Sequence, residues 1–220
     1  MNKIYQKPYY QDQSVTIYHG DCRQIVPQLG NFDLLLTDPP YGIGVDKSMN
    51  KKSGKHFKGS AAPCGTYKVT NWDNQPPSRW VFEMLLSVCK KSVMWGGNFF
   101  DVAPSKGWLV WDKLNGESDF SDCELAWTNL KTPIRKKEHL WNGMLRKNKE
   151  QRWHPTQKPV ELMQWCINLA GDVQTILDPF AGSGTTGRAA KDLGKQAVLV
   201  EMDEQYCEIA AQRMAQEVLL

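Results

Sequence analysis

Short apolar runs alternate along the chain with stretches in which apolar residues recur at helical spacing. The runs predict seven strands, at Val15–His19, Asp33–Thr37, Ser92–Trp95, Gly107–Asp112, Leu125–Thr128, Thr175–Asp178 and Gln196–Glu201. Helical spacing and capping residues predict helices over residues 22–30, 78–90, 159–170, 185–193 and 203–214. Strands that alternate with helices indicate an α/β fold with a mainly parallel, seven-stranded sheet flanked by helices.

Two stretches interrupt this pattern, residues 42–78 and 129–153, and both are rich in basic residues. Neither has clear apolar periodicity, so we expect two long inserted loops in a single domain, residues 1–220. Residues 45–70 carry a formal charge of +5 and residues 131–158 carry +7, whereas the whole chain carries +3. An acidic body with two basic segments suggests a polyanionic partner held by those segments. Two solvated, disordered loops are the alternative interpretation.

Composition and cysteine placement argue against several classes of protein. Hydrophobic residues are 41% and charged residues 23% of the chain, which is typical of a globular domain. No apolar run reaches the length that spans a bilayer, and the N-terminus does not resemble a signal peptide. Six cysteines form no C-x-x-C pair, and His139 and His154 lack metal-ligand spacing. We therefore expect no metal site, no membrane contact, and reduced thiols in the cytoplasm.

The strand at Asp33–Thr37 ends in Asp38-Pro39-Pro40-Tyr41, which combines a carboxylate, carbonyl acceptors and a flat ring. Neither proline has an N–H group, so regular sheet pairing stops here. Two acceptors suit the two N–H bonds of an exocyclic amine on a planar heterocycle, and the tyrosine ring suits stacking on it. A strand that merely ends at two prolines, with a solvated aspartate and a packed tyrosine, is the alternative interpretation of these four residues.

A second motif, Gly-Ser-Gly-Thr-Thr-Gly at residues 182–187, matches the G-x-G-x-x-G pattern of dinucleotide-binding loops between a strand and a helix. Glu201 ends the next strand, where an acidic residue accepts hydrogen bonds from ribose hydroxyls. Asp178 precedes the loop, and at ~4 Å and an effective dielectric near 20 its charge would cost a pyrophosphate roughly 4 kcal/mol. A cationic ligand would gain from that charge, and Phe180 adds an apolar surface. S-adenosylmethionine (AdoMet) therefore fits better than NAD.

The two motifs together resemble the catalytic and AdoMet motifs of DNA amino-methyltransferases, which modify adenine N6 or cytosine N4. The catalytic motif comes first, as in the circularly permuted β-class of that family. Further segments that resemble its motifs are Gly20-Asp21-Cys22, Trp95-Gly96-Gly97-Asn98, Trp111-Asp112-Lys113 and His154-Pro155-Thr156-Gln157-Lys158-Pro159. The resemblance covers most of the chain. It implies a Rossmann-like class I AdoMet-dependent methyltransferase fold, permuted so that Val15–His19 lies beside Gln196–Glu201.

The resemblance also implies residue roles. Asp38 would accept a hydrogen bond from the target amine, the Pro39 carbonyl would be the second acceptor, and Tyr41 would stack on the extruded base. With Pro40, these residues form the expected catalytic set. The implied cofactor-binding set is Asp21, Cys22, Asp38, Thr156, Lys158, Asp178, Phe180, Gly182, Ser183, Gly184, Thr185, Glu201 and Met202. Within it, Thr156 and Lys158 would reach the methionine carboxylate.

Basic residues interleaved with aromatics suit phosphate contacts and base stacking. The expected DNA-binding residues are Lys51, Lys52, Lys55, Lys58, Arg135, Lys136, Lys137, Trp141, Arg146, Lys147 and Arg152. Many members of the family carry a larger target-recognition region than residues 129–153 provide. We therefore expect a short or relaxed target in double-stranded DNA, read by a monomer or a homodimer.

Aspartate rather than serine opens the catalytic motif, so the resemblance favours adenine N6 over cytosine N4. Alternatives from other classes are a non-catalytic DNA-binding subunit and an NAD-dependent oxidoreductase; RNA is a weaker alternative substrate. The resemblance also fits a bacterial or phage-infected cell, in a restriction–modification system or as a solitary enzyme.

Overall fold

A computed structural model describes residues 7–44, 73–115, 121–142, 145–146, 151–154 and 156–216 of the chain. Its main feature is a nine-stranded sheet in the order β1-β2-β11-β10-β3-β4-β6-β5-β7, beside a two-stranded hairpin, β8-β9. The strands are β1 Tyr10–Gln11, β2 Val15–His19, β3 Phe32–Thr37, β4 Cys89–Trp95, β5 Gly107–Asp112, β6 Cys123–Thr128, β7 Arg135–Glu138, β8 Trp141–Asn142, β9 Leu145–Arg146, β10 Thr175–Asp178 and β11 Gln196–Glu201. In the large sheet, β1 and β6 pair antiparallel with their neighbours, and the other pairs are parallel.

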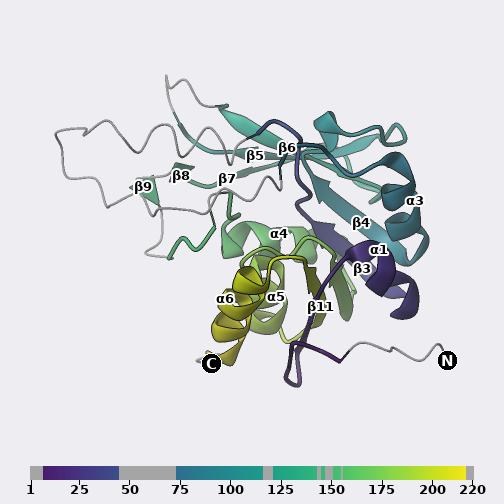
Figure 1. Ribbon diagram of the computed structural model, residues 1–220. Helices are drawn as coiled ribbons and strands as arrows, with labels where there is room; N and C mark the ends of the chain where they lie inside the picture. The colour runs from purple at the N-terminus through teal and green to yellow at the C-terminus, as the bar shows by residue number, and fades with distance from the viewer. Residues whose placement is uncertain are drawn as a thin grey trace.

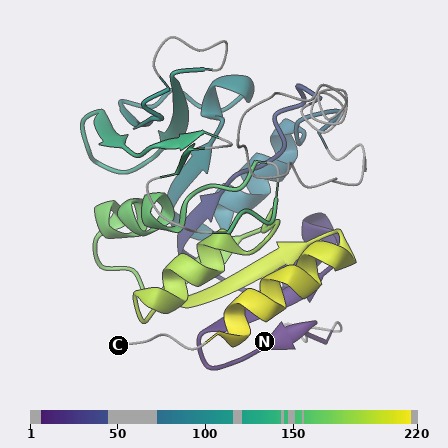
Figure 2. The same cartoon turned by 90° about the vertical axis from the view of Figure 1, so that its left-hand side faces the viewer.

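Helices cover both faces of the sheet and create three layers (Figure 1). On one face lie α4 (Val160–Ala170), α5 (Thr185–Asp192) and α6 (Glu204–Ala215), which Figure 2 turns toward the viewer. On the other face lie α1 (Cys22–Ile25), the 3-10 turn η1 (Val26–Gln28) and α3 (Arg79–Ser87). A second 3-10 turn, η2 (Gly97–Phe99), follows β4.

The apolar run of β3 explains why both faces are covered. Leu34 and Leu36 are fully buried in the cluster formed with α4, α5 and α6. Leu35 is fully buried in the cluster on the opposite face, with α1 and α3. Successive side chains of a strand point to opposite faces, so a run without polar residues requires helices on both sides.

Parallel pairing brings the carboxyl ends of β2, β11, β10 and β3 to one edge of the sheet. Val15–His19 pairs with Gln196–Glu201, and its His19 lies opposite Glu201. This neighbour relation was predicted from the sequence and is confirmed. Ligands of open α/β sheets bind at this edge, because loops and helix N-termini converge there.

All seven predicted strands are present, but the predicted number is wrong because the large sheet has nine. β1 is a two-residue strand that pairs antiparallel with β2 and is too short to give a periodic signal. β7 lies within the predicted 129–153 loop and pairs parallel with β5. Its four residues, Arg-Lys-Lys-Glu, are exposed or half-buried. An edge strand without an apolar face leaves no hydrophobic pattern to detect.

The helix predicted over residues 78–90 ends at Ser87, and Cys89 is instead the first residue of β4. The next two lysines are held at the sheet. The Nζ of Lys90 lies 2.8 Å from Asp33, and the Nζ of Lys91 donates to the carbonyl of Ala170 over 2.6 Å. With these contacts, both lysines belong to β4, which therefore begins before its apolar run.

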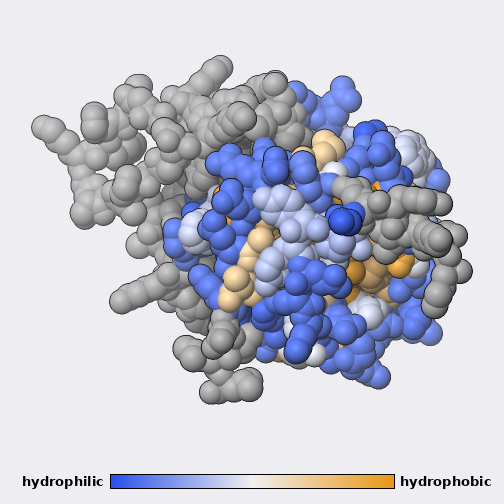
Figure 3. All heavy atoms as spheres, turned by 60° about the horizontal axis from the view of Figure 1, so that its bottom comes forward, coloured by the Kyte–Doolittle hydropathy of each residue, from blue (hydrophilic) through white to orange (hydrophobic). Residues whose placement is uncertain are grey.

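The coloured residues of the surface turned forward in Figure 3 are mostly hydrophilic, with small separate apolar areas. Scattered exposed apolar side chains of this kind are normal for folded proteins. Within the described residues, no helix combines the length and the apolar character that crossing a bilayer requires.

Candidate functional site

A pocket of about 970 Å³ opens at the carboxyl ends of β2, β3, β10 and β11. The predicted site residues that line it are Asp21, Cys22, Asp38, Pro40, Thr156, Lys158, Asp178, Phe180, Gly182, Ser183, Thr185, Glu201 and Met202. The fold thus brings Asp38 and Pro40 to the same cavity as the glycine loop, although about 140 residues separate them in the sequence, whereas Pro39 and Tyr41 are not among its lining residues.

The glycine loop is held by the carboxylate of Glu201 at the end of β11. Its Oε2 accepts the N–H of Gly182 over 2.7 Å, and its Oε1 accepts the N–H groups of Met202 and Asp203 over 2.8 Å each. A carboxylate has about four acceptor positions, so about one remains for a ligand. Burial raises the pKa of Glu201, and the three N–H donors oppose this rise.

Asp178, at the end of β10, is buried and hydrogen-bonded through both oxygens. Its Oδ1 accepts the Thr37 hydroxyl over 2.7 Å and the N–H of Phe180 over 3.1 Å. Its Oδ2 accepts the Thr186 hydroxyl over 2.5 Å. Burial raises the pKa of Asp178 to about 6, although these hydrogen bonds favour the ionised form. Asp178 therefore fixes the turn at Phe180 and adds negative charge to the pocket at neutral pH.

Two residues of the predicted cofactor-binding set, Gly184 and Asp21, also stabilise local structure at the start of a helix. Gly184 (φ 78°) caps α5 and is absent from the described pocket lining; a Cβ there would lie 2.8 Å from the Cβ of Ala210. Glycine at position 184 therefore permits close packing of α5 on α6. Asp21 caps α1 by accepting the N–H of Arg23 over 2.9 Å. Hydrogen bonds from the Arg23 side chain hold the pKa of Asp21 below its usual value.

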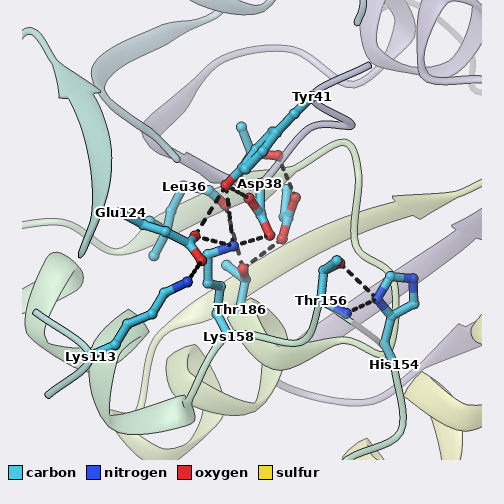
Figure 4. Close-up of polar contacts among 11 residues, drawn as sticks. Leu36, Asp38, Tyr41, Lys113, Glu124, His154, Thr156, Lys158 and Thr186 are labelled. Carbon is cyan, nitrogen blue, oxygen red and sulfur yellow. Dashed lines mark hydrogen bonds and ion pairs between the residues drawn. The ribbon is translucent and has the colours of Figure 1, made fainter. Parts of the chain in front are cut away.

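Asp38 lies in a cluster of charged and hydroxyl groups drawn in Figure 4. The Nζ of Lys158 is 2.5 Å from its Oδ2, and the hydroxyl of Tyr41 donates to its Oδ1 over 2.7 Å. The Nζ of Lys158 also lies 3.1 Å from Oε2 of Glu124, and the Tyr41 hydroxyl lies 3.4 Å from that oxygen. Lys113 completes the cluster with a 2.5 Å ion pair to Oε1 of Glu124.

The cluster pairs two carboxyl groups with two ammonium groups. Burial lowers the pKa of Lys158, but the charges of Asp38 and Glu124 outweigh burial and raise it. Burial raises the pKa of Asp38, and Lys158 opposes this rise. Burial would also raise the pKa of Glu124, but the charges of Lys158 and Lys113 lower it to about 2. Removing one partner of such a set leaves an uncompensated buried charge.

Lys158 and Thr156 are engaged with protein groups in this structure. The ammonium of Lys158 contacts Asp38 and Glu124, so it would have to change partners to reach a methionine carboxylate. The Thr156 N–H donates to Nδ1 of His154 over 3.2 Å. Burial and the charges of Lys158 and Arg152 lower the pKa of His154 to about 3, so its ring is neutral and can accept this bond.

The ring of Tyr41 is fixed by the turn after β4. Phe99 stacks on it with ring centroids 5.0 Å apart and an interplanar angle of 16°, and Phe100 meets it edge-on at 6.0 Å. A Cβ at Gly96 (φ 74°) would overlap Cε1 of Tyr41, so this approach requires glycine. The turn thereby directs the Tyr41 hydroxyl toward Asp38.

The pocket has an acidic lining. Its carboxylates are Asp21, Asp38, Asp178, Glu201, Asp203 and Glu204, and its permanently cationic groups are Arg23 and Lys158. An excess of negative charge favours a ligand with a positive group and disfavours a pyrophosphate.

Sequence reasoning missed the role of several site residues. Glu124 falls outside the strand predicted at Leu125–Thr128, yet it belongs to β6 and lies opposite Trp111 in the register. A single acid inside an otherwise apolar strand was the available signal. Asp73, which is 1% exposed, accepts the N–H of Gly42 over 2.8 Å beside the catalytic tetrapeptide. Nothing in the sequence marks that contact, because it joins the two ends of the segment 42–78.

Among the residues predicted to bind DNA, Trp141 is only 7% exposed and belongs to the same core cluster as Trp95 and Trp111. The prediction that Trp141 contacts DNA is therefore wrong. Charged neighbours in the sequence hid its apolar environment, which tertiary packing creates.

The basic residues predicted to bind DNA have different surroundings. Arg135 is exposed on β7. Lys136 pairs with Asp112 and Glu138, Lys137 pairs with Glu161, and Nε of Arg152 donates to the carbonyl of His154. Lys51, Lys52, Lys55, Lys58 and Lys147 lie outside the described residues, as does the side chain of Arg146.

Comparison with known sequences gives a consistent set of relatives. The profile of a family described as DNA methylase (N6_N4_Mtase) matches residues 103–212, which is half of the chain. Type II methyltransferase M2.LlaDCHI of Lactococcus lactis subsp. cremoris is 26% identical, and the alignment covers 94% of this chain and 92% of that protein. Type II methyltransferase M.ScaI of Streptomyces caespitosus is 28% identical, with coverage of 99% and 86%.

Solved structures share the fold. The M1.HpyAVI–SAM complex matches with a TM-score of 0.57 and 22% identity, covering 92% of this chain and 100% of that one. The PvuII DNA methyltransferase, described as cytosine-N4-specific, matches with a TM-score of 0.62 and 14% identity, covering 99% and 92%. Similarity at these identities supports a common class I methyltransferase architecture.

Proposed function

The chain belongs to the DNA methylase family of the N6/N4 type, and on that premise we propose that it transfers a methyl group from AdoMet to N6 of adenine in DNA. One observation carries this proposal. The carboxylate of Asp38 lines the same cavity as Phe180 of the glycine loop and Glu201 of β11. A group that can receive an amine and groups suited to an adenosine ligand therefore line one cavity.

The residues of the pocket fit AdoMet. A cavity of about 970 Å³ lies within the range of small-molecule sites, and its carboxylates exceed its cations. Phe180 offers an apolar surface, Glu201 retains an acceptor position for a ribose hydroxyl, and Asp178 places negative charge near a cationic centre. When bound, AdoMet supplies the electrophilic methyl group.

Asp38 and the carbonyl of Pro39 then act on the substrate amine. The lone pair of an exocyclic amine is delocalised into the ring, which makes the nitrogen a poor nucleophile. Two acceptors on its hydrogens favour pyramidal geometry and stabilise the positive charge that develops on nitrogen. No covalent intermediate with the protein is required, and the four described buried cysteines have no part in this step.

Access to the base requires extrusion from the duplex, which costs a few kcal/mol. Stacking on the ring of Tyr41 offsets part of that cost. The exposed Arg135, together with the basic residues in the segments 42–78 and 129–153, would neutralise DNA phosphates.

Nucleoside mass spectrometry of unmethylated DNA, incubated with the protein and AdoMet, tests the proposal. N6-methyladenine is the expected product. Formation of N4-methylcytosine would support methylation of an exocyclic amine but contradict adenine as the target base. Absence of any methylated nucleoside, with AdoMet bound, would contradict the transfer itself and favour a DNA-binding role.

A further inference from the structure

Each oxygen of Asp38 already contacts one protein donor. The Tyr41 hydroxyl donates to Oδ1 over 2.7 Å, and the Lys158 ammonium lies 2.5 Å from Oδ2. A carboxylate held by an ammonium ion is a weaker acceptor for an amine. Each oxygen keeps a further acceptor position, but the ammonium ion neutralises the charge of Asp38, so in the proposed reaction Asp38 accepts the substrate amine more strongly once Lys158 has moved away.

Glu124 lies within reach of both donors. Its Oε2 is 3.1 Å from the Nζ of Lys158 and 3.4 Å from the Tyr41 hydroxyl (Figure 4). Its other oxygen is anchored by Lys113 at 2.5 Å. β6, which carries Glu124, is paired on both sides, with β4 and β5, so the carboxylate stands on a rigid element.

We propose that Glu124 is a positioning residue that receives the hydrogen bonds of Lys158 and Tyr41 as Asp38 turns to the substrate amine. This inference rests on the proposed methyl transfer. No proton changes owner in the exchange: Lys158 stays an ammonium ion and Tyr41 keeps its hydroxyl proton. Asp38 is thereby freed on the side where it accepts an N–H of the base.

Burial makes the second acceptor necessary. Lys158 is only 5% exposed, and an unpaired buried ammonium is strongly unfavourable. Without Glu124, Lys158 would remain on Asp38 and compete with the substrate. With Glu124, the ammonium keeps a carboxylate partner in both arrangements.

A pH profile distinguishes this role from a structural one. The titratable groups around the cluster are Asp38, Tyr41, Lys113, Glu124, His154, Lys158 and Asp178. Burial raises the pKa of Asp38, Lys158 lowers it, and the charge of Glu124 raises it. Removing that charge therefore lowers the pKa of Asp38, and the acidic limb of the rate profile moves to lower pH.

The test compares Glu124→Gln with Glu83→Gln, a matched change at an exposed glutamate of α3. We expect Glu124→Gln to lower kcat by about 10- to 100-fold at saturating AdoMet, the size of effect that misplaced catalytic groups produce. We also expect its acidic limb to shift down and its AdoMet Kd to stay unchanged. Glu83→Gln should match the wild type in all three measurements.

Four results would overturn the inference. Glu124→Gln could keep full kcat, or lose kcat with an unmoved acidic limb, which marks a structural role. An inactive wild type would instead refute the proposed function, and the inference with it. If Glu124→Gln does not fold, Lys113→Met gives the opposite prediction: Glu124 then binds Lys158 more tightly, and the acidic limb moves up. An unmoved limb in that variant would count against the inference.

Discussion

The hydroxyl of Tyr41 donates a 2.7 Å hydrogen bond to Oδ1 of Asp38, three residues earlier in the chain. Burial, together with the charges of Asp38 and Glu124, raises the pKa of Tyr41 well above its ordinary value, so the phenol keeps its proton at every working pH. The tyrosine therefore has two separable features, a ring that can stack on a base and a hydroxyl that occupies Asp38.

Phenylalanine at position 41 separates these two features. Tyr41→Phe keeps the ring and frees Oδ1 of Asp38, so its kcat should stay close to that of the wild type or exceed it. Tyr41→Ala also removes the stacking surface, which is worth about 1–3 kcal/mol per base, and should bind a base-flipped duplex more weakly. Steady-state transfer and duplex binding measure both effects. A phenylalanine variant as impaired as the alanine variant would contradict a stacking role.

Gly96 controls the position of the Tyr41 ring. A methyl group at Gly96 would overlap Cε1 of Tyr41 and would also strain a residue at φ 74°. Gly194 is a matched control, because it has φ 65° and a methyl group there would meet no other atom within 4 Å. Both alanine variants should lose about 1–2 kcal/mol of stability from the backbone, but only Gly96→Ala should also lose transfer activity. Denaturant melts and kcat measurements on the two variants check this.

The raised pKa of Asp178 makes the free energy of unfolding decrease as the pH rises. Its pKa is about 6 in the folded protein and about 3.9 in an unfolded chain, so the folded state binds the extra proton between these values. From this group alone, stability is highest below about pH 4 and falls by about 3 kcal/mol as the pH rises to 7. Urea titrations of the wild type and Asp178→Asn at several pH values should differ by this slope. Parallel pH curves would show that Asp178 titrates normally.

Trp141 and Arg135 should respond differently to truncation, although both lie in the second basic segment. Trp141→Ala removes a core side chain and should cost about 3–5 kcal/mol of stability. Arg135→Ala should leave stability within about 0.5 kcal/mol and lower the salt slope of DNA binding by about one. Thermal melts and binding at several salt concentrations distinguish the two. An unchanged salt slope for Arg135→Ala would remove β7 from the DNA interface.

Local pattern was sufficient for much of the fold. The apolar runs that became β3, β10 and β11 are buried on both faces, so their hydrophobicity is continuous and easy to detect. The pairing of β2 with β11 followed from the resemblance, since no local signal specifies which strands become neighbours. The charged strand β7 escaped detection because it buries no apolar face, and β1 escaped because two residues give no periodic signal.

Some residues of the site could likewise be predicted from local sequence, and others could not. Asp38, Asp178 and Glu201 were found because each ends a strand beside a turn with a distinctive composition. Glu124 and Gly96 were not assigned roles, since their importance arises from contacts with Lys158 and Tyr41 that only the tertiary structure creates. The prediction for Trp141 was wrong for the opposite reason: its charged sequence neighbours suggested an exposed side chain, whereas the side chain is packed in the core.

The central claim is that Asp38 acts on the substrate base, and that AdoMet still binds when its carboxylate is removed. Asp38→Ala should be measured for single-turnover methyl transfer and, by calorimetry, for AdoMet binding, with Asp101→Ala as a control at an exposed aspartate. We predict that transfer by Asp38→Ala falls by at least about 10²–10³, the loss typical when a transition-state hydrogen-bond partner is removed, while AdoMet affinity stays within about tenfold. Loss of AdoMet binding with normal binding of the target base would contradict the claim.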